Sequence, residues 1–165
     1  MASKPNILFI MTDQQRADHV GFMGNSVVQT PHLDSLAASG CVFENAWVSN
    51  PVCMPNRATI LTGRMPTAHG VIFNDRSLDW HANTFVRRLR ADGYRTALLG
   101  KSHLQHGMSR NAVVDFRGEG AVLRSEPAGW DQFEDFERYA DGLPEDPGDF
   151  YGFEKIALSI DHGAR

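Results

Sequence analysis

One cysteine of this sequence lies in a run whose residue types could support nucleophilic chemistry. Cys53 is followed by Pro55 and Arg57, and a helix is predicted from near Pro55 to just before Gly63. Cys53 would then stand beside a helix N-terminus, where free N–H groups and the helix dipole favour anions. Arg57 adds a cation with several donors. The alternative is an inert, buried cysteine beside a surface arginine, and the whole run favours the anion site.

Two further polar side chains follow a predicted strand, Arg95–Leu99. Lys101 and His103 are two residues apart, so in an extended chain they project to the same side. A lysine can bind an oxyanion, and a histidine can move a proton near neutral pH. Without other motifs, a polar loop with no chemistry is the preferred interpretation.

An acidic residue follows the first apolar run. Asp13 and then Gln14 come directly after Asn6–Met11, which is predicted to be a buried strand. Ligands bind at the carboxyl ends of strands in open α/β sheets, and side-chain oxygens suit a hard divalent cation. An aspartate that caps the following turn is an equal alternative.

The elements that must position these residues alternate between strand and helix. Further predicted strands are Cys41–Val48 and a last one entered at Tyr151–Arg165. Further predicted helices run from Thr30-Pro31 to Gly40 and from Asn83 or Thr84 to Gly93, with one helical turn marked by Trp130, Phe133 and Phe136. This order predicts an α/β fold with a mostly parallel sheet.

Composition narrows the class of protein. The chain has 165 residues, 42% hydrophobic and 22% charged, which is typical of one globular domain. A net charge of -4 argues against nucleic acid as the main partner. The longest apolar run, Ile7–Met11, is too short to span a membrane, and no secretory signal is evident. With two cysteines, Cys41 and Cys53, we expect free thiols and a cytoplasmic location.

Charge is unevenly distributed along the chain. Residues 1–125 hold 13 Lys/Arg against 9 Asp/Glu, which suits an anionic ligand, whereas residues 126–149 hold 9 acids and one arginine. Residues 105–149 show little periodicity and are interpreted as an acidic, Gly- and Pro-containing loop region.

Taken in order, the motifs resemble the N-terminal part of the formylglycine-dependent sulfatases, in the alkaline phosphatase superfamily. The pieces that carry the resemblance, from residue 5 to about residue 104, are Pro5-Asn6-Ile7-Leu8 running into Asp13, Thr30-Pro31-His32-Leu33-Asp34, Cys53-Met54-Pro55-Asn56-Arg57, Leu61-Thr62-Gly63-Arg64, His69-Gly70-Val71, Gly93-Tyr94-Arg95-Thr96 and Gly100-Lys101-Ser102-His103-Leu104. The resemblance implies an alkaline-phosphatase-like parallel sheet sandwiched by helices. Residues 1–165 would form the N-terminal portion of its catalytic domain.

The resemblance also implies a mechanism. A separate formylglycine-generating enzyme would oxidise Cys53 to an aldehyde, whose hydrate offers two hydroxyls. One hydroxyl, bound to a divalent metal, would attack the sulfur of a small-molecule sulfate ester and form a covalent sulfo-enzyme; the other would assist the release of sulfate. Arg57 would steady the hydrate and the metal site, Lys101 would bind a sulfate oxygen, and His103 would support the hydrate.

The implied metal site has one departure from the family pattern. Asp13 would ligate the metal together with the modified Cys53, with calcium preferred and magnesium or manganese as alternatives. Many sulfatases carry a second aspartate where this chain has Gln14, which can still offer a carbonyl oxygen. The Asp-Gln pair resembles choline-sulfatase and phosphonate monoester hydrolase relatives. Asn74 could bind substrate as in those relatives, or sit in a turn.

The remaining candidate ligands are set aside. In the family, the second metal pair comes from well beyond residue 165, and Asp161-His162-Gly163 follows the lysine motif too soon to be that pair. The other histidines show no ligand-like spacing and are interpreted as surface or packing residues: His19, His32, His81 and His106.

Three functions therefore compete. The first is a sulfuric-ester hydrolase. The second is a phosphonate or phosphate diester hydrolase, which Gln14 favours, while Lys101 and His103 speak against it. The third is a truncated, non-catalytic chain; the missing metal pair favours it, and the isolated chain would then expose a sheet edge and be poorly soluble.

Overall fold

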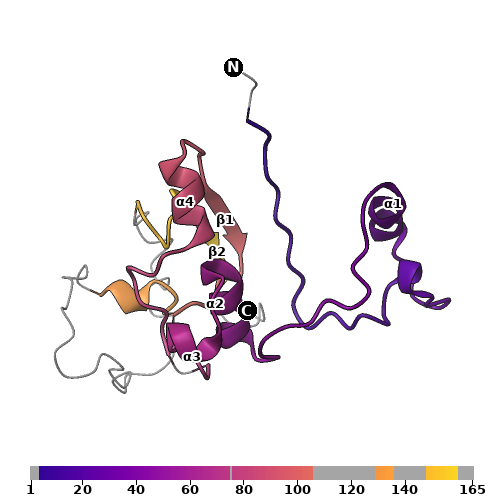
Figure 1. The fold of residues 1–165 in the computed structure, drawn as a ribbon, viewed down its shortest axis with the longest axis horizontal. Helices are drawn as coiled ribbons and strands as arrows, with labels where there is room; N and C mark the ends of the chain where they lie inside the picture. Colours follow the sequence, from indigo (N-terminus) through magenta and orange to yellow (C-terminus); the bar gives the residue numbers. More distant parts are fainter. Residues whose placement is uncertain (1–3, 75, 106–128, 136–147, 160–165) are drawn as a thin grey trace. The chain divides into compact units, whose positions relative to one another are not determined.

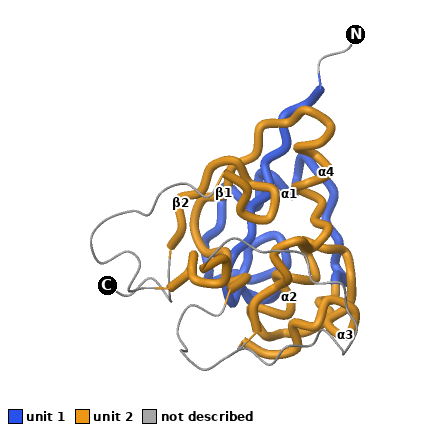
Figure 2. The backbone as a smooth tube through the Cα atoms, turned by 90° about the vertical axis from the view of Figure 1, so that its left-hand side faces the viewer, with its two compact units in different colours: residues 1–46 blue, residues 47–165 orange. Residues whose placement is uncertain are grey.

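The chain forms two compact units, residues 1–46 (unit 1) and residues 47–165 (unit 2), coloured blue and orange in Figure 2. The computed structural model describes residues 4–74, 76–105, 129–135 and 148–159. The elements of unit 1 are a 3-10 helix, η1 (Gly21–Met23), and α1 (Pro31–Ser39), both visible in Figure 1.

Polar contacts join the two helices of unit 1. The Gly21 N–H donates to the Thr30 hydroxyl oxygen and the Phe22 N–H donates to Asp34 Oδ1, both at 2.8 Å. The Thr30 hydroxyl donates in turn to Asp34 Oδ1 at 2.9 Å. The predicted helix is confirmed, with Pro31 as its first residue. Thr30 occupies the N-cap position, but its hydroxyl accepts the Gly21 N–H rather than a backbone N–H of α1.

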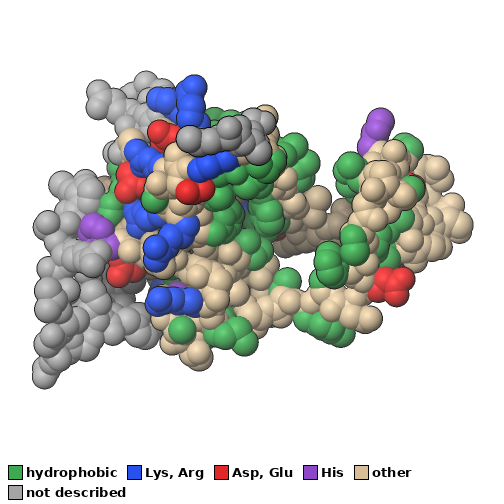
Figure 3. Space-filling view, turned by 45° about the horizontal axis from the view of Figure 1, so that its top comes forward, with side chains coloured by type: hydrophobic (Ala, Val, Ile, Leu, Met, Phe, Trp, Pro, Cys, Tyr) green, Lys and Arg blue, Asp and Glu red, His purple; other side chains and the backbone are tan. Residues whose placement is uncertain are grey.

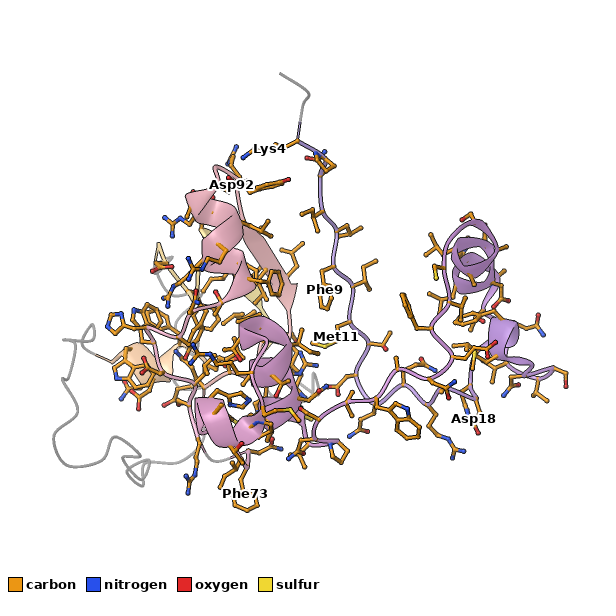
Figure 4. The ribbon with its side chains drawn as sticks, viewed as in Figure 1. Lys4, Phe9, Met11, Asp18, Phe73 and Asp92 are labelled. Carbon is orange, nitrogen blue, oxygen red and sulfur yellow. The ribbon has the colours of Figure 1, made fainter. Side chains whose placement is uncertain are left out.

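The predictions of strands at Asn6–Met11 and Cys41–Val48 are wrong for the described residues, where neither segment forms a strand. Their apolar side chains are exposed, with Phe9 at 61% and Phe43 at 79%. Figure 4 shows Phe9 and Met11 along the first segment, which runs as extended chain. A strand exists only through hydrogen bonds to a neighbour, so an apolar, β-forming sequence is not sufficient. No described segment supplies that neighbour.

Unit 2 contains all the other elements of the described chain: α2 (Cys53–Thr62), α3 (Pro66–His69), α4 (Phe85–Ala91), β1 (Ala97–Gly100), the 3-10 helix η2 (Trp130–Gln132) and β2 (Lys155–Leu158). The predicted helix is confirmed as α2, which begins at Cys53, slightly before Pro55. Proline is tolerated there because N–H groups of the first helical turn have no acceptor within the helix. α2 ends before Gly63, as predicted, and Gly63 adopts the left-handed conformation (φ 65°).

Thr84 caps α4, as predicted, and also anchors it. Its Oγ1 accepts a hydrogen bond from the Arg87 N–H at 3.1 Å, and its hydroxyl donates to the Tyr151 carbonyl at 2.7 Å. The side chain is fully buried. One hydroxyl therefore satisfies a helix N-terminus and a carbonyl from a distant part of the chain.

The two strands pair in parallel, as the fold prediction requires. Ala97 lies opposite Lys155 and Gly100 lies opposite Leu158. The predicted strand Arg95–Leu99 is shifted toward its C-terminal end, and the strand expected after Tyr151 begins only at Lys155. β1 ends at Gly100 and leads directly into the loop that begins with Lys101.

An aromatic cluster forms the centre of the core of unit 2. Trp80 stacks on Phe133 with ring centroids 5.6 Å apart, and Phe150 meets Tyr151 edge-on at 4.9 Å. The other buried apolar side chains of this core are Met54, Ala58, Leu61, Val71, Leu78, Val86, Leu104 and Phe153. The predicted helical turn at Trp130 is present as η2, whereas Phe136 lies outside the described residues.

The surface of unit 2 mixes charges of both signs, as Figure 3 shows. Arg87 and Arg90 of α4 both pair with Asp149, at 3.3 and 3.4 Å. Within the described residues, no helix has the length and apolar character needed to cross a membrane.

Replacing Thr84 tests the double role of its hydroxyl. We expect Thr84→Ala to lower the free energy of unfolding by about 1–3 kcal/mol, because it removes a helix cap and leaves a buried carbonyl without its donor. Chemical denaturation of the full-length protein measures this loss. Thr84→Ser, which keeps the hydroxyl, should lose less than half as much; an equal loss would contradict the assignment.

Candidate active site

Cys53 is the first residue of α2 and is half-buried. The N-cap residue, Val52, is extended and has no side-chain acceptor for the first turn. Asn74 takes over that function, since its Oδ1 accepts a hydrogen bond from the Met54 N–H at 2.9 Å. Cys53 thus stands at a helix N-terminus, as predicted, where partial positive charge favours an anion.

Asn74 lies in a turn, one of the two placements open for it from the sequence. The same contact that satisfies α2 brings its side-chain amide beside Cys53. Its neighbour Phe73, labelled in Figure 4, is 59% exposed and belongs to the same turn. Asn74 is therefore adjacent to the candidate nucleophile, and its contact with substrate stays a prediction.

Lys101, in the loop after β1, contacts Cys53, and Arg57 of α2 contacts the backbone of Lys101. Lys101 Nζ lies 3.9 Å from Cys53 Sγ. Arg57 is buried, and its Nη1 donates to the Lys101 carbonyl at 2.7 Å. The sequence predicted both cations at the site, and the structure shows how their contacts differ: Lys101 directs its ammonium to the thiol, while Arg57 binds the Lys101 carbonyl.

The backbone just beyond Lys101 is bound by a residue that the sequence analysis missed. His103, Leu104 and Gln105 each direct a backbone N–H to the carboxylate of Glu134; the Leu104 and Gln105 bonds to Oε2 are both 2.6 Å, and the His103 bond is to Oε1. His103 adopts a positive φ of 50°, which is uncommon for a residue with a side chain. The only sequence signal for Glu134 was an acid among aromatic residues, and that stretch had been assigned to the acidic loop region.

Burial raises the pKa of Glu134 to about 7. The backbone N–H donors of Gln105, Leu104 and His103 oppose this rise, because they stabilise the ionised form. A carboxylate buried in this way costs free energy unless donors surround it, and here three donors do so.

A second polar contact set supports the same loop. The Gln105 side chain donates to the Trp130 carbonyl at 2.5 Å and accepts from the Phe133 N–H at 2.8 Å. The buried Tyr151 hydroxyl donates to the Leu78 carbonyl at 2.6 Å. Burial raises the pKa of Tyr151 well above its usual value, so this hydroxyl remains a donor throughout the neutral range.

His69, from the His69-Gly70-Val71 motif, makes contacts with α2 and with the backbone just after α3. Its Nδ1 accepts a hydrogen bond from the Val71 N–H at 3.2 Å, so its Nε2 carries the hydrogen that faces Thr59 Oγ1 at 3.0 Å. Burial lowers the pKa of His69, which favours this neutral tautomer. The residue therefore joins α2 to α3 rather than serving the reacting centre.

The two predicted metal ligands of unit 1 lie at an exposed bend. Asp13 and Gln14 follow the extended segment, and Gln14 has a positive φ of 51°. Nearby Asp18 is occupied differently: hydrogen bonds from Arg16 and His19 hold the pKa of its carboxyl well below the usual range. The role of Asp13 as a metal ligand stays a prediction.

Other candidate ligands were set aside in the sequence. His19 pairs with Asp18 at the surface, His32 is exposed and His81 is half-buried. His106 and residues 161–163 lie outside the described residues. In the part of the chain that the structure describes, no three His, Cys, Asp or Glu side chains gather closely enough to hold a metal ion.

Comparison with known proteins decides the family. A family model for sulfatases matches residues 5–145 of this sequence. The chain belongs to the sulfatase family. An ulvan-active sulfatase of Formosa agariphila is 44% identical over 112 residues, covering 68% of this chain and 22% of that protein.

Two solved structures of the same fold bear on the chemistry. A protein in complex with its substrate, D-glucosamine-2-N,6-O-disulfate, matches with a TM-score of 0.60 and 36% identity over 62% of this chain and 21% of that chain. A phosphonate monoester hydrolase of Agrobacterium radiobacter matches with a TM-score of 0.68 and 26% identity over 97% of this chain and 27% of that chain. The predicted alkaline-phosphatase-like α/β fold is confirmed.

The chain spans about a fifth of the length of the relatives it matches. That residues 1–165 form the N-terminal portion of a catalytic domain stays a prediction. The site described above therefore shows how the family's motif residues are held in this chain.

The buried Glu134 predicts a pH-dependent stability. Between the pKa of an unfolded glutamate, 4.5, and its folded value of about 7, the folded state holds a proton that the unfolded state has lost. Stability therefore falls as pH rises through this window, by about 3 kcal/mol from this group alone. Denaturation of wild type and Glu134→Gln across pH 4–8 isolates the effect, since the difference between the two should change over that window. A constant difference would contradict the assignment.

Proposed function

We propose that the protein carrying this chain hydrolyses sulfuric esters, with Cys53 as the precursor of its nucleophile. The observation that carries the proposal is the position of Lys101 Nζ, 3.9 Å from Cys53 Sγ at the first turn of α2. The family membership of the chain supports the same reaction. A formylglycine-generating enzyme is the partner that this proposal requires.

The residues around Cys53 suit a sulfate group. The N–H groups at the start of α2 and the Lys101 ammonium present positive charge to its oxygens. Arg57 holds the Lys101 backbone in place by the bond to its carbonyl and brings a second cation to the site. His103, fixed two residues further along, is the proposed support for the hydroxyls at position 53.

Oxidation of Cys53 to formylglycine would supply a hydrated aldehyde, one hydroxyl of which is the proposed nucleophile for sulfur. A thiol is a poor ligand for a hard cation, whereas the hydrate oxygen, the Asp13 carboxylate and the Gln14 amide oxygen all suit one. The donor set therefore fits calcium, with magnesium or manganese as alternatives. Asp13 and Gln14 are its proposed ligands within this chain, together with the modified residue 53.

A second candidate reaction is the hydrolysis of phosphonate monoesters. The phosphonate monoester hydrolase of Agrobacterium radiobacter matches 97% of this chain, and Gln14 follows the Asp-Gln pattern of such relatives. Lys101 and His103 favour the sulfatase reaction. Turnover of an aryl sulfate and of a phenylphosphonate ester by the same preparation separates the two: rapid phosphonate cleavage without sulfate release would reject the sulfatase proposal.

The two cysteines offer a matched test of the nucleophile. The full-length protein is expressed with a formylglycine-generating enzyme and assayed on an aryl sulfate and on a sulfated sugar, the substrate class of the solved relative. Cys53→Ala should lower kcat/KM by at least about 10⁴-fold, because the covalent route is lost. Cys41→Ala, at an exposed cysteine, should leave activity unchanged.

Peptide mass spectrometry of the active enzyme completes this test. The peptide that contains residue 53 should carry an aldehyde in place of the thiol, and the peptide that contains Cys41 should carry an intact thiol. Full activity with an unmodified thiol at Cys53, or an active Cys53→Ala variant, would overturn the assignment of Cys53.

A further inference from the structure

We propose that Glu134 is a positioning residue of this active site: its buried carboxylate holds the backbone of residues 103–105 and so fixes His103 and Lys101 against the reacting group at Cys53. The inference rests on the proposed function for the identity of the reaction. The contacts that carry it belong to unit 2 and to described residues alone.

The first step is the match between donors and acceptor. Three consecutive N–H groups, from His103, Leu104 and Gln105, converge on Glu134, and both carboxylate oxygens are used. A neutral amide has one acceptor oxygen and could serve only part of this set. A buried carboxylate is therefore the side chain that this stretch of backbone requires.

The second step is the conformation that these bonds maintain. His103 has a positive φ of 50°, which costs free energy for a residue with a Cβ and persists only where surrounding contacts impose it. Its own N–H is one of the three that Glu134 accepts. The carboxylate thus acts at the residue whose backbone is least able to keep this geometry unaided.

The third step is the fixation of Glu134 itself. The preceding residue, Phe133, stacks on Trp80 and donates its N–H to the Gln105 side chain at 2.8 Å. Gln105 Nε2 donates to the Trp130 carbonyl. Residues 103–105 and residues 130–134 therefore bind each other through both side chains and backbone. These contacts leave the Glu134 carboxylate little freedom to move with the loop.

The fourth step leads from these contacts to the reacting group at Cys53. Arg57 binds the Lys101 carbonyl at one end of the loop, and Glu134 binds residues 103–105 at the other. Lys101 is bound by the first of these anchors and His103 by the second. Losing one anchor would let both side chains shift, and a displacement of about 1 Å can lower the rate of an enzymatic reaction by about 100-fold.

The test compares Glu134→Gln with Asp131→Asn in the full-length enzyme. Glu134→Gln keeps the size of the side chain but turns one acceptor oxygen into a donor. Asp131→Asn removes one negative charge from the same segment, in η2, without touching the loop. We expect Glu134→Gln to lower kcat by about 100-fold with KM unchanged, as for an interaction that acts in the transition state. Asp131→Asn should retain wild-type kcat.

Amide hydrogen exchange provides a readout that does not depend on turnover. In the Glu134→Gln protein, peptides that contain residues 103–105 should exchange about tenfold faster, while those from α2 keep their protection. Glu134→Asp keeps the carboxylate but shortens the side chain by one methylene. If Glu134→Gln does not fold, the exchange of residues 103–105 and kcat are measured in Glu134→Asp instead.

The outcomes separate this inference from the proposed function. Faster exchange at residues 103–105 together with the fall in kcat supports it. Unchanged exchange overturns it, and so does faster exchange with an unchanged kcat, because Glu134 would then serve stability alone. A wild-type enzyme that releases no sulfate counts against the sulfatase proposal; the exchange measurement still decides whether Glu134 holds the loop.

Discussion

The candidate site depends on one constraint: the backbone polar groups of the loop after β1 are buried and must find partners within the protein. Buried N–H and C=O groups left without partners cost more free energy than a single hydrogen bond returns. Arg57 satisfies the Lys101 carbonyl, and Glu134 satisfies the amides of residues 103–105. Two buried side chains, Arg57 and Glu134, thus hold the backbone of one loop.

This arrangement separates the two kinds of charge that the site needs. Lys101 directs its ammonium to Cys53 at the helix N-terminus, so positive potential gathers where a sulfate would develop negative charge. The Glu134 carboxyl accepts hydrogen bonds from the backbone N–H groups of residues 103–105. The basic and the acidic side chain therefore have different partners: Lys101 faces the thiol, and Glu134 binds backbone N–H groups.

Particular residues show how far sequence reasoning reached. The helix after Cys53, the cap at Thr84 and the parallel pairing of the strands were predictable, because each rests on local patterns of Pro, Gly, capping and apolar residues. The strands expected at Asn6–Met11 and Cys41–Val48 were not realised, since strand formation depends on a partner that local sequence does not contain. Glu134 escaped notice because its three donors lie about thirty residues away.

The sequence by itself determined the family of the chain and predicted the chemistry of the site: an ordered set of motifs supplied a cysteine, two cations, a histidine and a carboxylate, residue types whose reactivity is local. Only the tertiary structure decided how they are held. It brought the Lys101 ammonium to the Cys53 sulfur, turned the Asn74 amide onto the first turn of α2, and assigned an acid from the loop region to the backbone around His103. The physical reason is that partners for buried polar groups come from distant segments, and only folding brings them within hydrogen-bond distance.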